Sequence, residues 1–223
     1  VYFGCGRFTH VQHEFVMAEV EDLHRGPGSE PVSARAAYAG STQVGPNGLV
    51  CYHNTQDLAD YSELGHAQVV QLTCNRSTFG LLAAAFFELC PKGTRRDREN
   101  SGSAYRSMVG LPGGFRSPLL PVLQKHAKDA GSVLLAPAQG ADPDNRDLGM
   151  VYIYDSKEFP AHLAEEYRQF EDDMSAIYKP ALLELEAAES ALPQCPGPGT
   201  PLPWELMGLF ACMLLAMLGI GYY

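Results

Sequence analysis

The sequence predicts a domain of mixed strands and helices, followed by a linker and a single membrane-spanning helix. The first part of the chain alternates short apolar runs with segments of helical periodicity. Residues 193–203, PQCPGPGTPLP, hold five prolines and two glycines, which neither a helix nor a sheet ladder accommodates. Residues 206–223 carry no charged side chain over 18 positions. A chain of 223 residues is long enough for one domain with appendages.

Each element of the domain has its own local pattern. The opening VYFG, residues 1–4, is typical of a strand start, and residues 10–24 place apolar side chains at the spacing of an amphipathic helix. Residues 67–73, AQVVQLT, predict a buried strand, and residues 81–89, LLAAAFFEL, predict a helix behind a Ser77/Thr78 cap. The remaining predicted elements are a helix starting at Ser117-Pro118, strands at 132–137 and 150–154, and two acidic helices over 160–192, the second starting at Pro180.

Residues 204–223 have the length and composition of a membrane-spanning helix. They extend about 30 Å as a helix, which is the thickness of a hydrocarbon core. Trp204 and the closing tyrosine pair are typical interfacial anchors. The alternative is a buried C-terminal helix of a soluble domain. Small residues on one face predict packing against another membrane helix, although such residues are common in membrane helices generally; they are Gly208, Cys212, Ala216 and Gly219.

The charge balance excludes one class of partner. The chain has 16 basic and 26 acidic residues and a net charge of -10, whereas nucleic-acid binding needs a concentrated basic face. The one basic cluster, KGTRRDR at residues 92–98, is interrupted by Asp97, and we interpret it as a solvated loop. No nucleic-acid partner is therefore expected.

The cysteines and histidines do not form a metal-binding pattern. Six cysteines show no CxxC pair and no regular spacing, which argues against a zinc ribbon and against a small disulfide scaffold. His10, His13 and Glu14 are close on one helical stretch, but the spacing is not HExxH and a third ligand is missing. A surface or core histidine pair is the preferred interpretation. We expect no metal and no cofactor.

Several segments resemble, in order, the sequence blocks of the A-type peptide methionine sulfoxide reductases. Any single block is weak, and their order and rough spacing make the resemblance more specific. It implies an α+β fold, a two-layer ferredoxin-like plait, over about residues 1–173. The expected domains are residues 1–178 for the reductase-like part, 179–203 for a helix and linker, and 204–223 for the membrane helix. The blocks are FGCGRFTHVQHEF, AAYAGS, ELGHAQVVQLT, LLAAAFFEL, SGSAYRSMV and AEEYRQF.

The resemblance implies that Cys5 occupies the position of the nucleophile. In the family this cysteine attacks the sulfoxide sulfur as a thiolate, favoured by the N-terminus of the following helix. Two aromatic residues normally follow it and hold the substrate methyl group, but here Gly6 and Arg7 stand there. An arginine head is charged and hydrated, although it could still lower the cysteine pKa.

The resemblance also implies that most of the supporting groups have been replaced. Gln68 stands at the position of the family's glutamate, which donates a proton to the departing oxygen. An amide cannot donate this proton, and the loss of a positioned acid typically lowers the rate by about 100- to 10,000-fold. Asn100 stands at an aspartate, while Tyr105 keeps a tyrosine of the sulfoxide-oxygen region. The other matched positions are Gln56 for a tyrosine, Arg168 for a histidine, and Cys195 in the region of a recycling cysteine, which could resolve a sulfenic acid on Cys5.

Each of these positions also has a structural interpretation. Cys5 can be a buried small residue at a strand end, since free cysteines are commonly buried. Tyr105 can hold a loop through its hydroxyl group, and Cys195 can be incidental in a linker. His66, within GHAQ, orients the backbone rather than binding a metal.

We interpret the sequence as a non-catalytic, membrane-anchored accessory subunit of a larger membrane complex, bound through residues 204–223 in a lipid bilayer. The chain lacks an initiator methionine and a signal segment, so we expect a processed organellar protein. A thylakoid membrane with a photosynthetic host complex is preferred over the mitochondrial inner membrane. The alternative is an active membrane-tethered peptide-methionine (S)-S-oxide reductase with Cys5 as nucleophile. A third hypothesis is redox sensing by Cys5.

Overall fold

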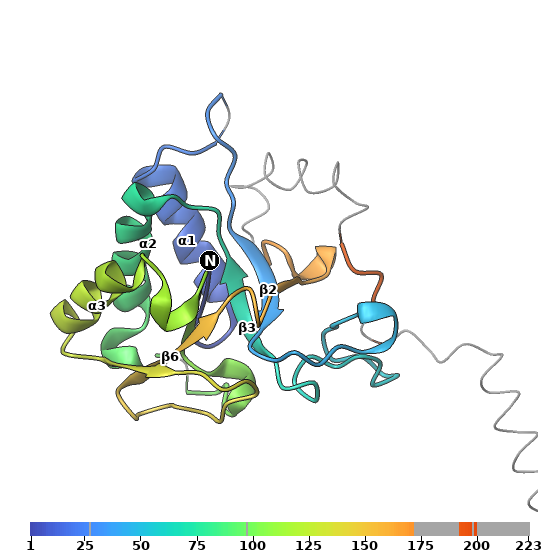
Figure 1. The fold of residues 1–223 in the computed structure, drawn as a ribbon. Helices are drawn as coiled ribbons and strands as arrows, with labels where there is room; N and C mark the ends of the chain where they lie inside the picture. The colour runs from blue at the N-terminus through green and yellow to red at the C-terminus, as the bar shows by residue number, and fades with distance from the viewer. Residues whose placement is uncertain (27, 97, 172–191, 198, 200–223) are drawn as a thin grey trace, which may run out of the picture.

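The computed structural model describes residues 1–26, 28–96, 98–171, 192–197 and 199. Within these ranges the chain forms one seven-stranded sheet and three α-helices (Figure 1). The strand order is β5-β6-β4-β1-β3-β2-β7. The helices are α1 (Phe8–Glu21), α2 (Arg76–Leu89) and α3 (Leu120–Asp129), and the strands are β1 (Tyr2–Gly4), β2 (Arg35–Ala39), β3 (Ala67–Gln71), β4 (Met108–Leu111), β5 (Leu134–Pro137), β6 (Met150–Asp155) and β7 (His162–Leu163).

The sheet is mixed. The pairs β1–β3, β1–β4, β2–β3 and β2–β7 are antiparallel, whereas β6 runs parallel to both β4 and β5. Strand β1 lies at the centre, so the residue that follows it emerges from the middle of the sheet edge.

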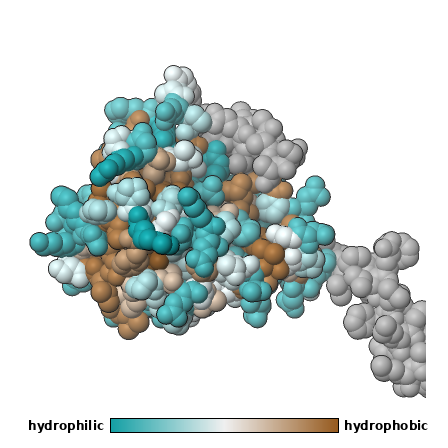
Figure 2. All heavy atoms as spheres, in the orientation of Figure 1, coloured by the Kyte–Doolittle hydropathy of each residue, from teal (hydrophilic) through white to brown (hydrophobic). Residues whose placement is uncertain are grey.

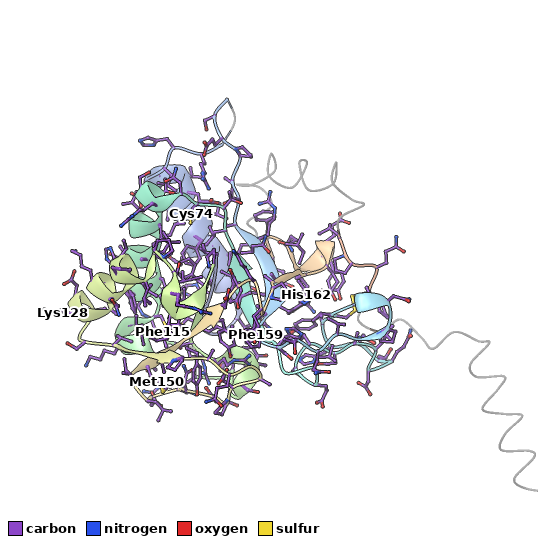
Figure 3. The ribbon with its side chains drawn as sticks, viewed as in Figure 1. Cys74, Phe115, Lys128, Met150, Phe159 and His162 are labelled. Carbon is purple, nitrogen blue, oxygen red and sulfur yellow. A yellow bond between two sulfur atoms is a disulfide. The ribbon has the colours of Figure 1, made fainter. Side chains whose placement is uncertain are left out.

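Side-chain alternation along the strands separates two hydrophobic clusters. Phe3 and Val70 face one side of the sheet, and their neighbours Tyr2 and Val69 face the other. The buried residues of all three helices belong to the Phe3 side, which is the larger core. The opposite side is covered by loop residues such as Phe159, which Figure 3 labels. The helices therefore form one layer and the sheet the other, as Figure 1 shows.

The predicted fold is wrong. A ferredoxin-like plait followed by a membrane-spanning helix was expected, and the structure has a seven-stranded mixed sheet. Among the described residues no helix is long and apolar enough to cross a membrane. Residues 204–223 lie outside that range, as do Gly208, Cys212, Ala216 and Gly219.

The start of the predicted acidic helix region is also wrong. Instead of a helix, His162 and Leu163 pair with Tyr38 and Ala37 as strand β7. The free edge of β2 offers unpaired backbone groups, and this pairing satisfies them. Residues 172–191, which hold most of the two predicted acidic helices, are not among those described.

The predicted strands at 67–73, 132–137 and 150–154 are confirmed to within two residues, and the helices predicted at 10–24, at 81–89 and from Ser117 are present with shifted starts. Helix α2 begins earlier because Asn75 is its cap: its Oδ1 accepts from the backbone N–H groups of Ser77 and Thr78 at 2.9 and 3.0 Å. The hydroxyl oxygen of Thr78 accepts a hydrogen bond from the Asn75 backbone N–H, which completes a capping box. Ser77 and Thr78 thus lie inside the helix.

The visible face of the molecule mixes hydrophilic and hydrophobic residues (Figure 2). The large apolar side chains exposed among the described residues include Phe115, Leu134 and Leu148. Scattered exposed apolar residues of this kind are normal on soluble domains, so they mark no particular site.

Candidate functional site

The candidate site lies where β1 ends and α1 begins. Gly6 turns the chain there with φ +90°, a conformation that favours glycine. Its N–H donates to the Tyr105 carbonyl at 3.1 Å, and its Cα faces the aliphatic stem of Arg95. Gly4 allows β1 to approach β3, because a Cβ there would lie 2.7 Å from the Gln68 carbonyl oxygen. Both glycines thus fix the backbone on either side of Cys5.

Cys5 forms a disulfide with Cys90, at the end of α2. The two Cα atoms are 6.0 Å apart, and the exposed fractions are 5% and 0%. The hydroxyl group of the buried Ser107 lies 3.7 Å from the Cys5 sulfur and 3.4 Å from the Cys90 sulfur. The sulfur at the nucleophile position is therefore turned into the core, with one hydroxyl group beside it.

Cys195 is bonded to Cys51, and not to Cys5. The expectation that Cys195 resolves a sulfenic acid on Cys5 does not match this pairing. Among the described residues Cys74 is the cysteine outside a disulfide, and burial raises the pKa of its thiol (Figure 3). The spacing of the cysteines in the sequence did not indicate these two disulfides. Disulfides are typical of proteins in an oxidising compartment.

Gln68 has both polar atoms engaged by the protein. Its Oε1 accepts from the Phe8 backbone N–H at 3.0 Å, and its Nε2 donates to the Tyr61 hydroxyl at 2.9 Å. The side chain is fully buried. Phe8 is the first residue of α1, so the amide satisfies one of the N–H groups that every helix leaves open at its start. Gln68 therefore acts as a structural bridge between α1 and Tyr61.

Around Gln68 lies a cluster of aromatic rings. Tyr61 stacks on Tyr38 with centroids 4.7 Å apart and on Tyr52 at 5.7 Å, and its hydroxyl group is hydrogen-bonded to Tyr105. Phe8 packs on Tyr38 at 5.8 Å. Burial raises the pKa of Tyr61, so its phenol stays protonated at neutral pH. The phenol groups of the cluster thus serve as hydrogen-bonding groups.

Glu165 and Arg168 close this cluster. Glu165 is buried, accepts from the Tyr38 hydroxyl at 2.8 Å and accepts from the Tyr52 backbone N–H at 2.7 Å. The Arg168 guanidinium lies 3.6 Å from the centre of the Tyr52 ring. Arg168 also forms an ion pair with Glu171. Both side chains thus have protein partners, although Nε of Arg168 is buried without a hydrogen-bond partner among the described residues.

Arg7 does not contact the Cys5 sulfur. Its side chain is 43% exposed and reaches Glu171 at 3.4 Å. The hydroxyl group of Thr9 donates to the same carboxylate at 2.9 Å. Arg7 therefore belongs to a surface ion pair, which contributes little to stability.

The other expected site residues are spread around the cluster. Asn100 presents its backbone carbonyl to Arg95 Nε at 2.9 Å, and Gln56 lies in a turn where its N–H donates to Asn54. Tyr105 is half-buried and packs on the core. Of the expected residues, the structure brings Gln68 and Tyr105 together through Tyr61.

The histidines have structural surroundings. His66 Nε2 lies 2.7 Å from the Gln43 carbonyl, and burial lowers the pKa of His66 to about 4, so the ring is neutral at pH 7. His162 crosses it edge-on at 5.3 Å between ring centres. In the described part of the chain one group, Cys51, Glu165 and Cys195, has the proximity of metal ligands. Its two sulfurs are joined to each other, so they are not free to ligate.

Sequence reasoning missed Cys90, Ser107, Tyr61 and Glu165. Ser107 and Glu165 lie inside the blocks SGSAYRSMV and AEEYRQF, but neither was singled out. Cys90 follows directly on the predicted helix 81–89, and that position was the available signal. Comparison of the chain with models of protein families, with curated proteins and with solved structures finds no match to any of them.

Proposed function

We propose that this chain is a non-catalytic domain of the methionine sulfoxide reductase type, which serves as an accessory subunit of a larger protein assembly. The observation that supports this proposal is the environment of Cys5. Its sulfur is buried in a disulfide with Cys90, and the residue at the position of the acid is an amide with both ends bound. The proposal rests on the sequence resemblance together with these contacts.

Reduction of a sulfoxide requires a thiolate that reaches the substrate sulfur. At 5% exposure, and with its sulfur joined to the fully buried Cys90, Cys5 offers neither a free thiolate nor an approach for a peptide substrate. The disulfide has to be reduced, and the surrounding packing has to move, before any attack can occur.

The reaction also requires a proton for the departing oxygen. Gln68 has no proton to transfer, and the raised pKa of Tyr61 makes this phenol a weaker acid than a free tyrosine. Glu165 is the buried carboxylate of the cluster, and both of its oxygens already accept hydrogen bonds from Tyr38 and Tyr52. These groups are arranged to hold the fold together.

A domain cross-linked by two disulfides can present a stable surface to a partner. The two disulfides connect residues 85 and 144 positions apart in the chain, which limits the unfolded ensemble strongly. The partner is a larger protein complex. The membrane location expected from residues 204–223 concerns a segment outside the described residues.

A second candidate, an active reductase, is favoured by the same disulfide. In that cycle the Cys5 thiolate attacks the sulfoxide sulfur and the oxygen is transferred, which gives a thioether and a sulfenic acid on Cys5. The Cys90 thiol then displaces water to form the observed disulfide, and an external dithiol reduces it. Cys90 would be the resolving residue of this cycle.

Turnover by the purified full chain separates the two candidates. The chain is incubated with a methionine sulfoxide peptide and a dithiol reductant, and methionine formation is followed by chromatography. The accessory role predicts the same background for the wild type, Cys5→Ser and the control Cys74→Ser. Turnover that Cys5→Ser abolishes and Cys74→Ser preserves would establish the reductase instead.

A further inference from the structure

A basic groove of about 530 Å³ lies beside the end of α2, at the start of β6. Met150, labelled in Figure 3, marks the beginning of that strand, next to the lining residue Gly149. The groove is formed by the segment after α2 and the loop before β6. Its charged lining residues are Lys92, Arg95, Arg96, Arg98, Arg146 and Asp147.

The charge of this groove is opposite to that of the chain. The whole chain has a net charge of -10, yet five of its 16 basic residues line this one depression. Asp147 is the single acid among the described lining residues. Asp144 pairs with Arg95 and Asp147 lies 3.7 Å from Arg146, so these two acids offset only part of the positive charge, and the cations that remain favour an anion in the groove. The distribution therefore indicates a place where negative charge is bound.

Lys92, Arg96 and Arg98 are exposed, as expected for a solvated loop, but the segment is anchored where Gly93 and Arg95 are buried. Gly93 is buried with φ +72°, and a Cβ there would lie 2.8 Å from Val133 and 3.2 Å from the Met150 backbone. Arg95 is buried and forms two bonds, of 2.7 and 2.8 Å, with the carboxylate of Asp144. The pKa of Asp144 falls to about 2, first because of Arg95 and also because two backbone N–H groups donate to it. This ion pair forms a rigid base for the groove.

Two further cations, Arg96 and Arg146, each donate a hydrogen bond to a backbone carbonyl group. Arg96 donates from one terminal nitrogen to the Glu88 carbonyl at 3.0 Å. Arg146 donates from Nη1 to the Arg98 carbonyl at 3.2 Å, which ties the two walls together. A guanidinium has five N–H donors in a planar fork, so each keeps further donors for a ligand.

One of these donors lacks an acceptor. The Nε atom of Arg146 is buried without a hydrogen-bond partner among the described residues, and a carboxylate oxygen of Asp147 lies 3.7 Å from it. A buried donor without an acceptor is unfavourable. An anionic oxygen in the groove would supply the missing acceptor after a small movement of this side chain.

We propose that the groove binds an oligoanion with phosphoryl groups, either a soluble oligophosphate or the headgroup of a phosphorylated lipid. Several cations on two walls match a ligand with more than one negative charge, and the arginine forks match phosphoryl oxygens. Thr94 adds a hydroxyl group, and no aromatic ring lines the groove among the described residues. The ligand is therefore recognised by its charge and oxygen geometry, and not by a base or other ring.

Titration of the full chain with inorganic tripolyphosphate, followed by calorimetry, tests this inference. Arg96→Glu/Arg98→Glu is compared with Lys125→Glu/Lys128→Glu on α3, which makes the same change of net charge away from the groove (Lys128 is labelled in Figure 3). We expect binding that weakens between about 50 and about 200 mM salt. We expect an affinity loss of about tenfold or more, which corresponds to one charge-assisted contact, in the groove variant and little loss in the control variant.

Vesicles with and without a phosphorylated inositol lipid distinguish the two sources of the ligand. Co-sedimentation that tripolyphosphate displaces and the groove variant loses supports a headgroup, and binding of tripolyphosphate alone supports a soluble ligand. Absence of tripolyphosphate binding overturns the proposal. Equal losses in both charge variants, or equally tight binding of citrate, also overturn it, because they indicate attraction by net charge without phosphoryl recognition.

Discussion

Removal of the Cys5–Cys90 disulfide should destabilise the domain strongly. The bond joins residues 85 positions apart, and both partners are buried in the helix-side core. In the chain-entropy treatment, a loop of this length restricts the unfolded chain by an amount worth about 4.6 kcal/mol at room temperature. Measured effects of removing native disulfides are typically about 2–5 kcal/mol. Since domains of this kind are stable by about 5–15 kcal/mol, the loss is a large share of the total.

The perturbation is the double variant Cys5→Ala/Cys90→Ala, which removes the bond without leaving a buried thiol. Urea unfolding without reductant, followed by circular dichroism, gives the free energy of unfolding of the full chain. We expect a decrease of about 3–5 kcal/mol. The slope of the free energy of unfolding against urea concentration should increase as well, because the unfolded chain becomes more expanded. The matched control is Cys74→Ala, a half-buried cysteine outside any disulfide, which should change stability by less than about 1 kcal/mol.

A double variant that unfolds within about 1 kcal/mol of the wild type, like the control, would refute the reasoning. Mass spectrometry of the wild type adds an independent check, since a peptide that joins Cys5 to Cys90 is expected under non-reducing digestion. Free thiols at both positions would contradict the pairing on which the proposed function rests.

Two further predictions concern buried polar groups. Gln68→Ala leaves the Phe8 N–H and the Tyr61 hydroxyl group without their partner. We expect the free energy of unfolding, measured by urea unfolding, to fall by about 2–4 kcal/mol. An effect below about 0.5 kcal/mol would contradict the bridging role. Asp144 has a folded pKa of about 2, depressed below its usual 3.8, so it stabilises the fold above pH 4 and this contribution is lost as the pH falls toward 2. Asp144→Asn should therefore be less stable than the wild type at pH 7 and should lose less stability between pH 5 and pH 2 in acid unfolding. Parallel profiles of stability against pH for the two proteins would exclude the ion pair with Arg95 as the cause of the pH dependence.

Much of the fold follows from local sequence patterns. The amphipathic run around Phe15 becomes α1, which packs on the helix-side core, and the apolar run 67–73 becomes β3, whose apolar residues are buried alternately on both sides of the sheet. The edge strand β7 was missed because two residues carry no periodicity, and its formation depends on the free edge of β2. The parallel pairing of β6 with both neighbours also depends on contacts distant in the sequence.

The place of Cys5 in the fold was predictable, but its bonding was not. The sequence places Cys5 at the end of the first strand, and the structure has it there. Its partner was not predictable, because six cysteines allow many pairings and only the fold brings the end of α2 to the end of β1. Tyr61 was missed for the same reason: it lies seven residues before Gln68, and a turn brings its hydroxyl group back to the amide.

The proposed role of Cys5 is that of a structural cysteine in a domain without reductase activity. Its most direct test is methionine formation by the full chain from a methionine sulfoxide peptide, with excess dithiol and with Cys5→Ser measured alongside. We predict the same background rate for both proteins, even when the Cys5–Cys90 bond is shown to be reduced. Catalytic turnover in the wild type that is absent from Cys5→Ser would contradict this account.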